Sequence, residues 1–433
     1  MRGSYSVPIA PTSAQTGIGR LLPGLVLLGG TTALRPPTVS ISIFVLLCAA
    51  VLLALPLAET RRATRTPFWA LAFSLAVLLL LRIAAGAPLG GYYFLQMSAV
   101  VMIYGASLVL LRDDRSRFIS LLVGVSVGSA CLALLSSYGT LRWNLQDAVK
   151  YGAGVPVLFL VLALLVRRGV KQVWIHGLLF TVALAALFLN FRSLALVAVG
   201  SVLVLVARGR VGRHSFARFA GSVVLALVCY TLLTQMIERG IFGDVLARRH
   251  AAQAALGPSA LLGGRTEFPL SIAVISAKPL LGWGDLGSVP GSIIGRASTL
   301  ADSLGYASPE AYMQYWFTPA GGISLHSMVF ESWASQGILG VAVPVFVFFA
   351  AGNILLRWPA SDAMLPIAIV MALQVVWDLL FSPWQAGTAV FSGMLLALWA
   401  LRPMADRDIL LHGRGSEGWP RKTPRGISAL SVQ

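Results

Sequence analysis

Three residues of this chain have side chains that suit the transfer of a group away from a diphosphate: Arg192, Arg265 and His326. They stand in the stretches LNFRSLALVAVG, GGRTEFPLSIAVISAKPLLGWG and SLHSMVFESWASQGILG. A planar guanidinium offers paired N–H donors to phosphate oxygens. An imidazole with an ordinary pKa of about 6.5 can take a proton from a sugar hydroxyl near neutral pH. Together the three residues predict the active site of a metal-independent transferase.

Each of these residues also has a structural interpretation. Arg192 lies at the end of an apolar run, where an arginine often only anchors a helix at the lipid headgroups. Arg265 follows two glycines that let a ligand approach the backbone, and the helix predicted after it, with Thr266 as a cap, adds N–H donors for an anion. Glu267 could instead hold Arg265 in an ion pair. A lone histidine such as His326 is more often structural than catalytic.

Other basic residues are weaker candidates for phosphate contacts. Arg248 and Arg249 form a compact basic patch with His250, which could meet acidic phosphates on a lipid acceptor or could be a solvated helix face. Lys278 opens KPLLGWG, which predicts a helix stop followed by a glycine turn, so its ammonium could simply complement the end of a helix. Sugar-stacking platforms and an interfacial aromatic belt are the two interpretations of Trp283, Trp316 and Trp333.

The composition indicates a polytopic membrane protein. Of the 433 residues, 57% are hydrophobic and only 11% are charged, and the mean hydropathy is +0.81. A soluble domain carries about 25% charged residues. Runs of about 20 apolar residues, the length that a helix needs to cross a bilayer, recur at short intervals. Because the runs are continuous and do not alternate as the strands of a barrel do, we expect an all-α fold.

We predict about twelve transmembrane helices interrupted by one large loop. Residues 1–236 would hold the first nine helices, residues 237–334 a large periplasmic loop domain with helical segments, residues 335–402 the last three helices, and residues 403–433 a basic cytoplasmic tail. The predicted helices span residues 20–34, 38–57, 68–85, 93–111, 117–136, 153–168, 173–190, 193–207, 216–236, 335–356, 363–381 and 386–402.

The short connections between these helices set the orientation, because cytoplasmic loops retain lysine and arginine. Alternate connections are nearly bare, whereas the others hold basic clusters that contain Arg61, Arg112, Arg167, Arg208 and Arg357. We therefore expect a multi-pass protein of the bacterial inner membrane with both termini in the cytoplasm. The loop domain would lie on the periplasmic side, and Arg192, at the turn between the seventh and eighth helices, would lie there too.

Local patterns predict the secondary structure of the loop domain. We expect helices near residues 241–256 and 266–278, and an irregular stretch rich in Gly and Ser over residues 282–298. The run from Met328 to Ile338 has helical periodicity and leads into the tenth span, so His326 would stand just ahead of a helix.

The sequence gives little support to other classes of chemistry. The formal charge is +17, but the basic residues are scattered in short clusters, so we expect no nucleic acid and instead predict membrane lipids and phosphorylated substrates as partners. No HExxH, CxxC, P-loop or clustered Asp-x-Asp motif is present, so we expect no metal and no other cofactor. The cysteines lie in apolar runs, where a thiol usually only packs.

The stretch from about residue 187 to residue 340 resembles the O-antigen ligase and polymerase superfamily of bacterial membrane glycosyltransferases. Three features carry the resemblance: Arg192 in NFRS near the outer end of a middle span, Arg265 ahead of KPLLGWG, and His326 ahead of GILG. The family often has serine before the first arginine and asparagine after the histidine, where this chain has phenylalanine and serine.

The resemblance implies a GT-C-like helical enzyme that acts on the periplasmic side of the membrane. In ligases an undecaprenyl-diphosphate-linked glycan is the donor and a sugar of the lipid A-core of lipopolysaccharide is the acceptor, with inversion and without a metal. Arg192 and Arg265 would hold the diphosphate, and His326 would activate or orient the acceptor hydroxyl. Weaker phosphate contacts would come from Arg248, Arg249 and Lys278.

An O-antigen ligase is the function that we expect, and two alternatives remain open. An O-antigen polymerase would join lipid-linked repeat units; the basic loop favours a ligase, since each Lys or Arg near an anionic acceptor surface contributes about 1 kcal/mol. A lipid-linked glycan transporter, which is not an enzyme, would place its charged residues along a cavity through the bilayer. Here the basic residues cluster at the ends of the predicted spans.

Overall fold

The computed structural model describes residues 62–87, 91–111, 115–138, 148–189, 191–210, 234–258, 263–317 and 322–402, with single positions between residues 221 and 232. The first two predicted spans, most of the ninth and the C-terminal tail lie outside the described residues. Over the described residues the chain is all-helical, as predicted, with one isolated antiparallel bridge between Phe317 and Ile323. All of the elements discussed below belong to one unit, Met1–Leu401.

Each described helix that flanks the loop segment overlaps a predicted span, with bounds that differ by up to seven residues. The third to eighth spans are α3 (Arg62–Ala84), α4 (Gly91–Leu111), α5 (Arg115–Tyr138), a π-helical turn (Val149–Ala153) that continues into α7 (Gly154–Arg167), α8 (Gln172–Phe188) and α9 (Arg192–Arg210). The last three are α17 (Ala342–Arg357), α18 (Leu365–Phe381) and α19 (Ala386–Ala400).

Three helical stretches of the described residues are long and apolar enough to cross a membrane: Thr66–Ala84, Gly91–Leu111 and Ile338–Arg357. The described part also contains shorter apolar helices of 10–17 residues. At a rise of about 1.5 Å per residue these are shorter than a hydrocarbon core of about 30 Å. Length and composition therefore support a membrane protein, whereas the predicted number of spans stays a prediction.

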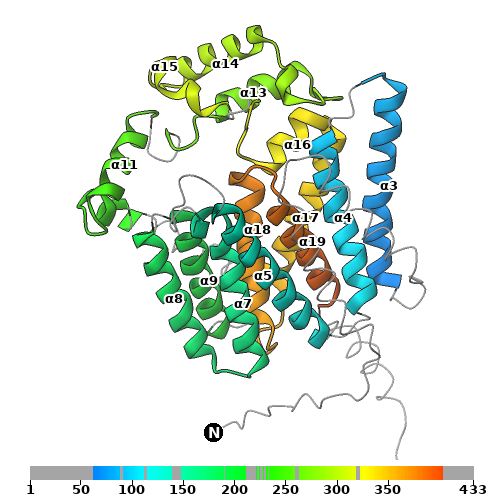
Figure 1. Ribbon diagram of the computed structural model, residues 1–433, viewed down its shortest axis with the longest axis vertical. Coiled ribbons are helices and arrows are strands. Elements are labelled where there is room, and N and C mark those ends of the chain that lie inside the picture. The colour runs from blue at the N-terminus through cyan, green and yellow to red at the C-terminus, as the bar shows by residue number, and fades with distance from the viewer. Residues whose placement is uncertain are drawn as a thin grey trace, which may run out of the picture. The chain divides into compact units, whose positions relative to one another are not determined.

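Helices α18 and α19 form the centre of the helical bundle (Figure 1). α18 packs against α17, α9 and α7, and α19 packs against α4 and α17. The stretch from Ile367 to Ala372 is completely buried. Large apolar side chains on the outer helices, such as Phe73 and Phe180, are exposed, which is the pattern of a bundle that meets lipid on its outside.

Helix α9 runs antiparallel to α18. The guanidinium of Arg208, near the end of α9, donates to the carbonyl oxygens of Leu355 and Trp358, just before α18 begins. Halfway along, a β-carbon at Gly200 would lie 3.6 Å from the side chain of Leu373. This register brings Arg192, the first residue of α9, to the end of the bundle at which α18 finishes.

The segment between α9 and α17 forms a layer of short helices across that same end (Figure 1). Its elements are α11 (Asp244–Ala254), α13 (Phe268–Ala277), a 3₁₀ turn (Leu286–Ser288), α14 (Gly291–Ser303), α15 (Pro309–Tyr312), a second 3₁₀ turn (Met313–Tyr315), α16 (Met328–Gln336) and a third (Ile338–Val341).

The predicted helices near residues 241–256 and 266–278 and the helix after His326 are confirmed by α11, α13 and α16. The predicted irregular stretch over residues 282–298 is wrong in its second half, because α14 begins at Gly291. The apolar positions Ile293, Ala297 and Ala301 recur at helical spacing and are buried in a small core against α13. The high content of Gly and Ser in this stretch favoured an irregular structure and obscured the helical spacing of these apolar residues.

The glycine motifs on either side of His326 meet in the fold. The N–H groups of Trp283 and Gly284 donate to the carbonyl oxygens of Ala334 (2.8 Å) and Ser335 (2.7 Å). Gly282 (φ 67°) and Gly337 (φ 73°) lie in this contact, and neither site has room for a β-carbon.

The fully buried Arg82 of α3 closes this glycine junction from the bundle side. Its Nη1 donates to the carbonyl oxygens of Leu281 and Ser335 and to Oε1 of Gln336, each at 2.9 Å. One cation therefore holds the turn after α13 and the end of α16 to the end of α3.

We predict that Gly337→Ala lowers the thermal stability of the detergent-solubilised protein by at least about 1 kcal/mol, since the new side chain needs positive φ and overlaps the carbonyl of Leu280. Gly295→Ala is the matched control, because Gly295 is an exposed helical position with open space around it. Melting curves that shift equally for the two variants would contradict the junction.

Candidate functional site

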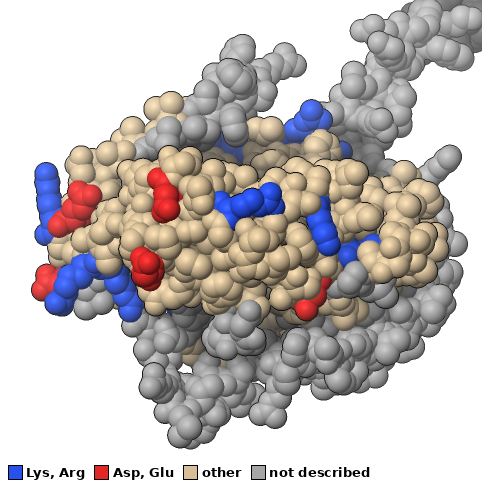
Figure 2. Space-filling model, turned by 90° about the horizontal axis from the view of Figure 1, so that it is seen from above, with Lys and Arg blue, Asp and Glu red and all other residues tan. Residues whose placement is uncertain are grey.

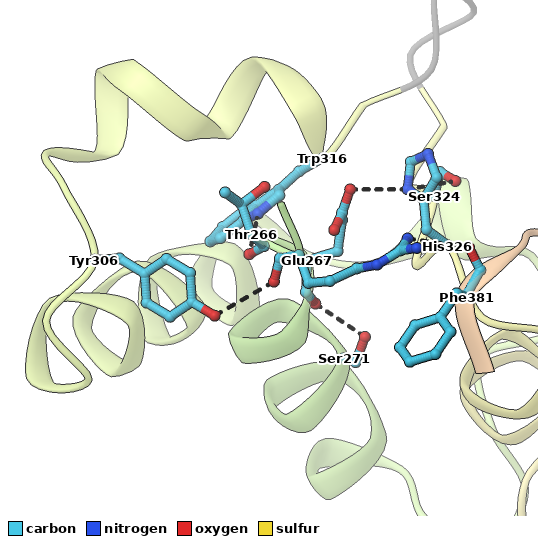
Figure 3. A network of polar contacts seen from close by, with 9 residues as sticks. Thr266, Glu267, Ser271, Tyr306, Trp316, Ser324, His326 and Phe381 are labelled. Carbon is cyan, nitrogen blue, oxygen red and sulfur yellow. Dashed lines mark hydrogen bonds and ion pairs between the residues drawn. The ribbon is translucent and has the colours of Figure 1, made fainter. Parts of the chain in front are cut away.

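The start of α13 positions the first part of the site. Two aromatic side chains hold the backbone ahead of the helix: the hydroxyl of Tyr306 donates to the carbonyl of Arg265 (3.3 Å), and Nε1 of Trp316 donates to that of Thr266 (2.8 Å) (Figure 3). Thr266 is buried and does not cap the helix as predicted. The residue before the helix is Glu267, and no side chain caps there.

His326 provides the second part. Its Nδ1 lies 3.0 Å from Oε1 of Glu267 and 3.4 Å from Oγ of Ser324 (Figure 3). The imidazole is 38% exposed and the Glu267 side chain only 10%, so the ring has access to a substrate while its partner stays sheltered. Among the described residues, His326 is the only non-glycine with positive φ (47°), a conformation that costs about 1–3 kcal/mol.

The residues after His326 hold this strained turn. Ser327 caps α16 by accepting the N–H of Phe330 (3.3 Å), and its hydroxyl donates to the carbonyl of Leu379 in α18 (3.0 Å). The turn is thus attached both to the helix that follows it and to the central helix of the bundle.

A buried carboxylate, Glu331, lies one turn further along α16. It accepts a hydrogen bond from the backbone N–H of Trp384 (2.8 Å). Trp384 makes two further hydrogen bonds. Its indole Nε1 donates to Oγ of Ser332 (2.8 Å), and its carbonyl oxygen accepts from the hydroxyl of Tyr92 (2.6 Å). Burial raises the pKa of Glu331 to about 7, although the Trp384 N–H and the charge of His326 oppose this rise. Glu331 thus joins α16 to the connection between α18 and α19.

The surroundings of His326 favour its protonated form. Burial alone would lower the pKa of His326, and Arg265 acts in the same direction. The hydrogen bond and the charge of Glu267, with a smaller contribution from Glu331, outweigh both and raise the pKa above its ordinary value. Glu267 therefore stabilises a positive charge on the imidazole.

Arg265 points from the start of α13 towards the end of α18 rather than to the pocket described below. Its Nη1 donates to the carbonyl oxygen of Phe381 (3.0 Å), and its Cζ lies 4.8 Å from the centre of the Phe381 ring. Burial lowers the pKa of Arg265 and Glu267 opposes that effect, but a guanidinium remains charged. The carboxylate of Glu267 contacts His326, so Glu267 does not serve Arg265 alone as an ion-pair partner.

Arg192 is half-buried at the first position of α9. The register between α9 and α18 places it at the end of the bundle where Arg265 contacts Phe381. A ring contact between Phe188 and Phe242 (6.4 Å) attaches the turn before α9 to the start of the loop segment. The two predicted phosphate ligands therefore reach the same end of the bundle from different parts of the chain.

A pocket of about 580 Å³ opens on the other side of the Glu267–His326 pair. Figure 2 shows this end of the molecule, where acidic and basic side chains gather at the edge that α11 occupies. The pocket is lined by Arg249, Ala252, Gln253, Leu256, Gly263, Gly264, Thr266, Glu267, Gln314, Tyr315, Phe317, Ser324 and His326.

The remaining predicted contacts do not join this pocket. Arg248 is exposed on α11 but does not line it. Lys278 lies at the far end of α13, about 15 Å from the end that bears Glu267, and its ammonium stands 4.1 Å from the centre of the Trp283 ring. This contact agrees with the structural interpretation of Lys278.

Sequence reasoning did not identify several residues that build the site. The sequence suggests Glu267 only as a partner of Arg265 and gives no signal for Tyr315 and Phe317. None of the three tryptophans lines the pocket. Trp283 and Trp316 are buried, whereas Trp333 is partly exposed and its Nε1 donates to the carbonyl of Pro279 (3.0 Å). Within the described residues, no group of three or more His, Cys, Asp or Glu side chains could hold a metal.

We predict that Glu267→Gln lowers the pKa of His326, because it removes the charge that favours the imidazolium. The measurement is the pH dependence of diethylpyrocarbonate modification of His326, read by mass spectrometry, since the reagent attacks neutral imidazole. The midpoint should move to lower pH in Glu267→Gln and stay unchanged in Glu310→Gln, which alters an exposed carboxylate elsewhere in the layer. Equal midpoints in all three proteins would contradict the pairing.

Comparison of the chain with protein-family models and with curated proteins finds no match. The link to a family therefore rests on the resemblance of the motifs around Arg192, Arg265 and His326. The reaction is inferred from the residues of the site.

Proposed function

We propose that the chain is a membrane glycosyltransferase of the O-antigen ligase type, which transfers a glycan from undecaprenyl diphosphate to a sugar hydroxyl of the lipid A-core. One observation carries the proposal: a strained, accessible histidine, backed by a sheltered carboxylate, borders a pocket at one end of an apolar helical bundle. A histidine paired in this way suits removal of a proton from an alcohol.

The pair supplies the base of the reaction. With Nδ1 protonated and donating to Glu267, Nε2 of His326 has the lone pair that accepts the proton of the acceptor hydroxyl. The hydroxyl oxygen then forms a bond to the anomeric carbon of the glycan from the face opposite the diphosphate. The bond from that carbon to the phosphate oxygen breaks, and its electron pair leaves with the diphosphate. Glu267 stabilises the imidazolium that results.

The two arginines at the end of α18 would receive the leaving group. Arg265 is partly desolvated, which strengthens its attraction for a phosphate, and its contact with Phe381 fixes its direction. Arg192 reaches the same end of the bundle. Two guanidinium groups would neutralise the charge that develops on the departing diphosphate without a metal ion.

The proposal includes about twelve spans in the bacterial inner membrane, with both termini cytoplasmic and the site periplasmic. The phenylalanine at the end of α8 contacts the loop segment, so the basic pair Arg167 and Arg168 that precedes α8 lies at the other end of the bundle. Arg208 and Arg357 lie there too. These basic residues of the described part therefore lie on the side away from the site.

The direct test is a reconstituted reaction of purified protein with undecaprenyl-diphosphate-linked glycan and lipid A-core, without nucleotide or added metal. We expect a ladder of modified core, which His326→Ala abolishes while donor binding is retained. A lengthened lipid-linked glycan with unmodified core would identify a polymerase instead. Glycan movement across the vesicle membrane that survives His326→Ala would identify a transporter.

We predict that Arg265→Lys lowers kcat of this reaction by about 10- to 100-fold, because an ammonium cannot reproduce the paired donors of a guanidinium. Arg248→Lys is the matched control and should retain nearly full activity, since Arg248 is exposed outside the pocket. Unchanged turnover in Arg265→Lys would remove Arg265 from the diphosphate site.

A further inference from the structure

The pocket beyond His326 has the composition of a sugar-binding site with a place for an anion. We infer that it is the acceptor subsite, and that it selects a sugar which carries a phosphate or a carboxylate group. The inference rests on the proposed function, because His326 on the pocket wall would act on a hydroxyl of this sugar. Three sets of side chains support it: two aromatic rings, two amides and one arginine.

Tyr315 and Phe317 line the pocket on either side of Trp316 in the chain. Trp316 is completely buried and donates its indole N–H to the backbone ahead of α13. Tyr315 is 50% exposed and Phe317 37% exposed, and both line the pocket. Exposed rings on a pocket wall suit the apolar C–H faces of a pyranose, because the polar edge of the sugar stays free.

The polar contacts come chiefly from one face of α11. Arg249, Ala252, Gln253 and Leu256 have helical spacing of three or four residues and line the pocket together. The neighbouring Arg248 is rotated by about 100° around the helix and lies outside it.

A close approach of the backbone fixes this face of α11. The carbonyl oxygen of Gln253 lies where a β-carbon at Gly263 would stand, so only glycine permits the contact between α11 and the start of α13. Gln314 also lines the pocket, and its amide nitrogen lies 3.4 Å from the carbonyl oxygen of Ala311, to which it donates. The side-chain amides of glutamines on a pocket wall can donate to and accept from sugar hydroxyls.

The charged side chains of the pocket lining differ in whether they already have a partner. The carboxylate of Glu267 is occupied by His326, so the reacting end holds a base rather than a free anion. Arg249 is an exposed cation, and its fork of donors fits two oxygens of a phosphate or carboxylate. A neutral sugar would leave this cation without a partner, and therefore an acidic sugar is the better ligand.

The test compares binding of glucose 6-phosphate and glucose to the purified full-length protein by isothermal titration calorimetry. We expect Arg249→Ala to weaken binding of glucose 6-phosphate about 10-fold, the effect of one charge-assisted hydrogen bond, and to leave glucose binding unchanged. Arg248→Ala should change neither, and Tyr315→Ala should weaken both. Equal effects of the two arginine variants, or equal affinity of the wild-type protein for the two sugars, would overturn the inference.

The reconstituted reaction separates this inference from the proposed function. We expect Arg249→Ala to raise KM for lipid A-core while KM for the lipid-linked donor stays the same. If no glycan is transferred but glucose 6-phosphate binds as described, the subsite stands and the transferase proposal fails. If transfer proceeds and Arg249→Ala behaves like Arg248→Ala towards the acceptor, the subsite fails and the transferase proposal stands.

Discussion

The contact between Glu267 and His326 sets what this end of the molecule can do. It joins the start of α13 to the turn ahead of α16. Each partner is also held by other contacts. The hydrogen bonds of Tyr306 and Trp316 hold the backbone before Glu267, and Ser327 holds the turn of His326 at the start of α16. Because the imidazole is held in a left-handed turn, it projects into the pocket instead of packing against α16. Arg265 does not line that pocket and contacts the end of α18 instead.

The rest of the loop segment maintains this contact. The glycine junction holds the far ends of α13 and α16 together, and Arg82 ties it to α3. Glu331 and Ser327 attach α16 to the last helices of the bundle. The short helices therefore cannot slide over the bundle without breaking buried polar contacts, whose loss is costly in a place that excludes water. The glycine motifs on either side of His326 serve this assembly and not the chemistry.

Much of the architecture could be predicted from the sequence because it depends on local pattern. The helix after His326, the glycine turn after Lys278 and the bounds of the flanking helices follow from apolar runs and stop signals. The pairing of Glu267 with His326 could not be predicted, because it depends on how two distant segments pack. The same holds for the contact of the Lys278 ammonium with the Trp283 ring. It also holds for Trp316, which is buried while its neighbours Tyr315 and Phe317 line the pocket. The left-handed backbone of His326, its exposure and its contact with Glu267 distinguish it from an ordinary packed histidine.

We propose that Arg192, Arg265 and His326 act on the same diphosphate-linked substrate at one end of the bundle. A cryo-electron microscopy structure of the protein with undecaprenyl diphosphate bound would test this proposal. We expect phosphate density within hydrogen-bond distance of Arg192 and Arg265, with His326 facing the place that the transferred sugar would occupy. A diphosphate bound away from these two guanidinium groups would contradict the proposal.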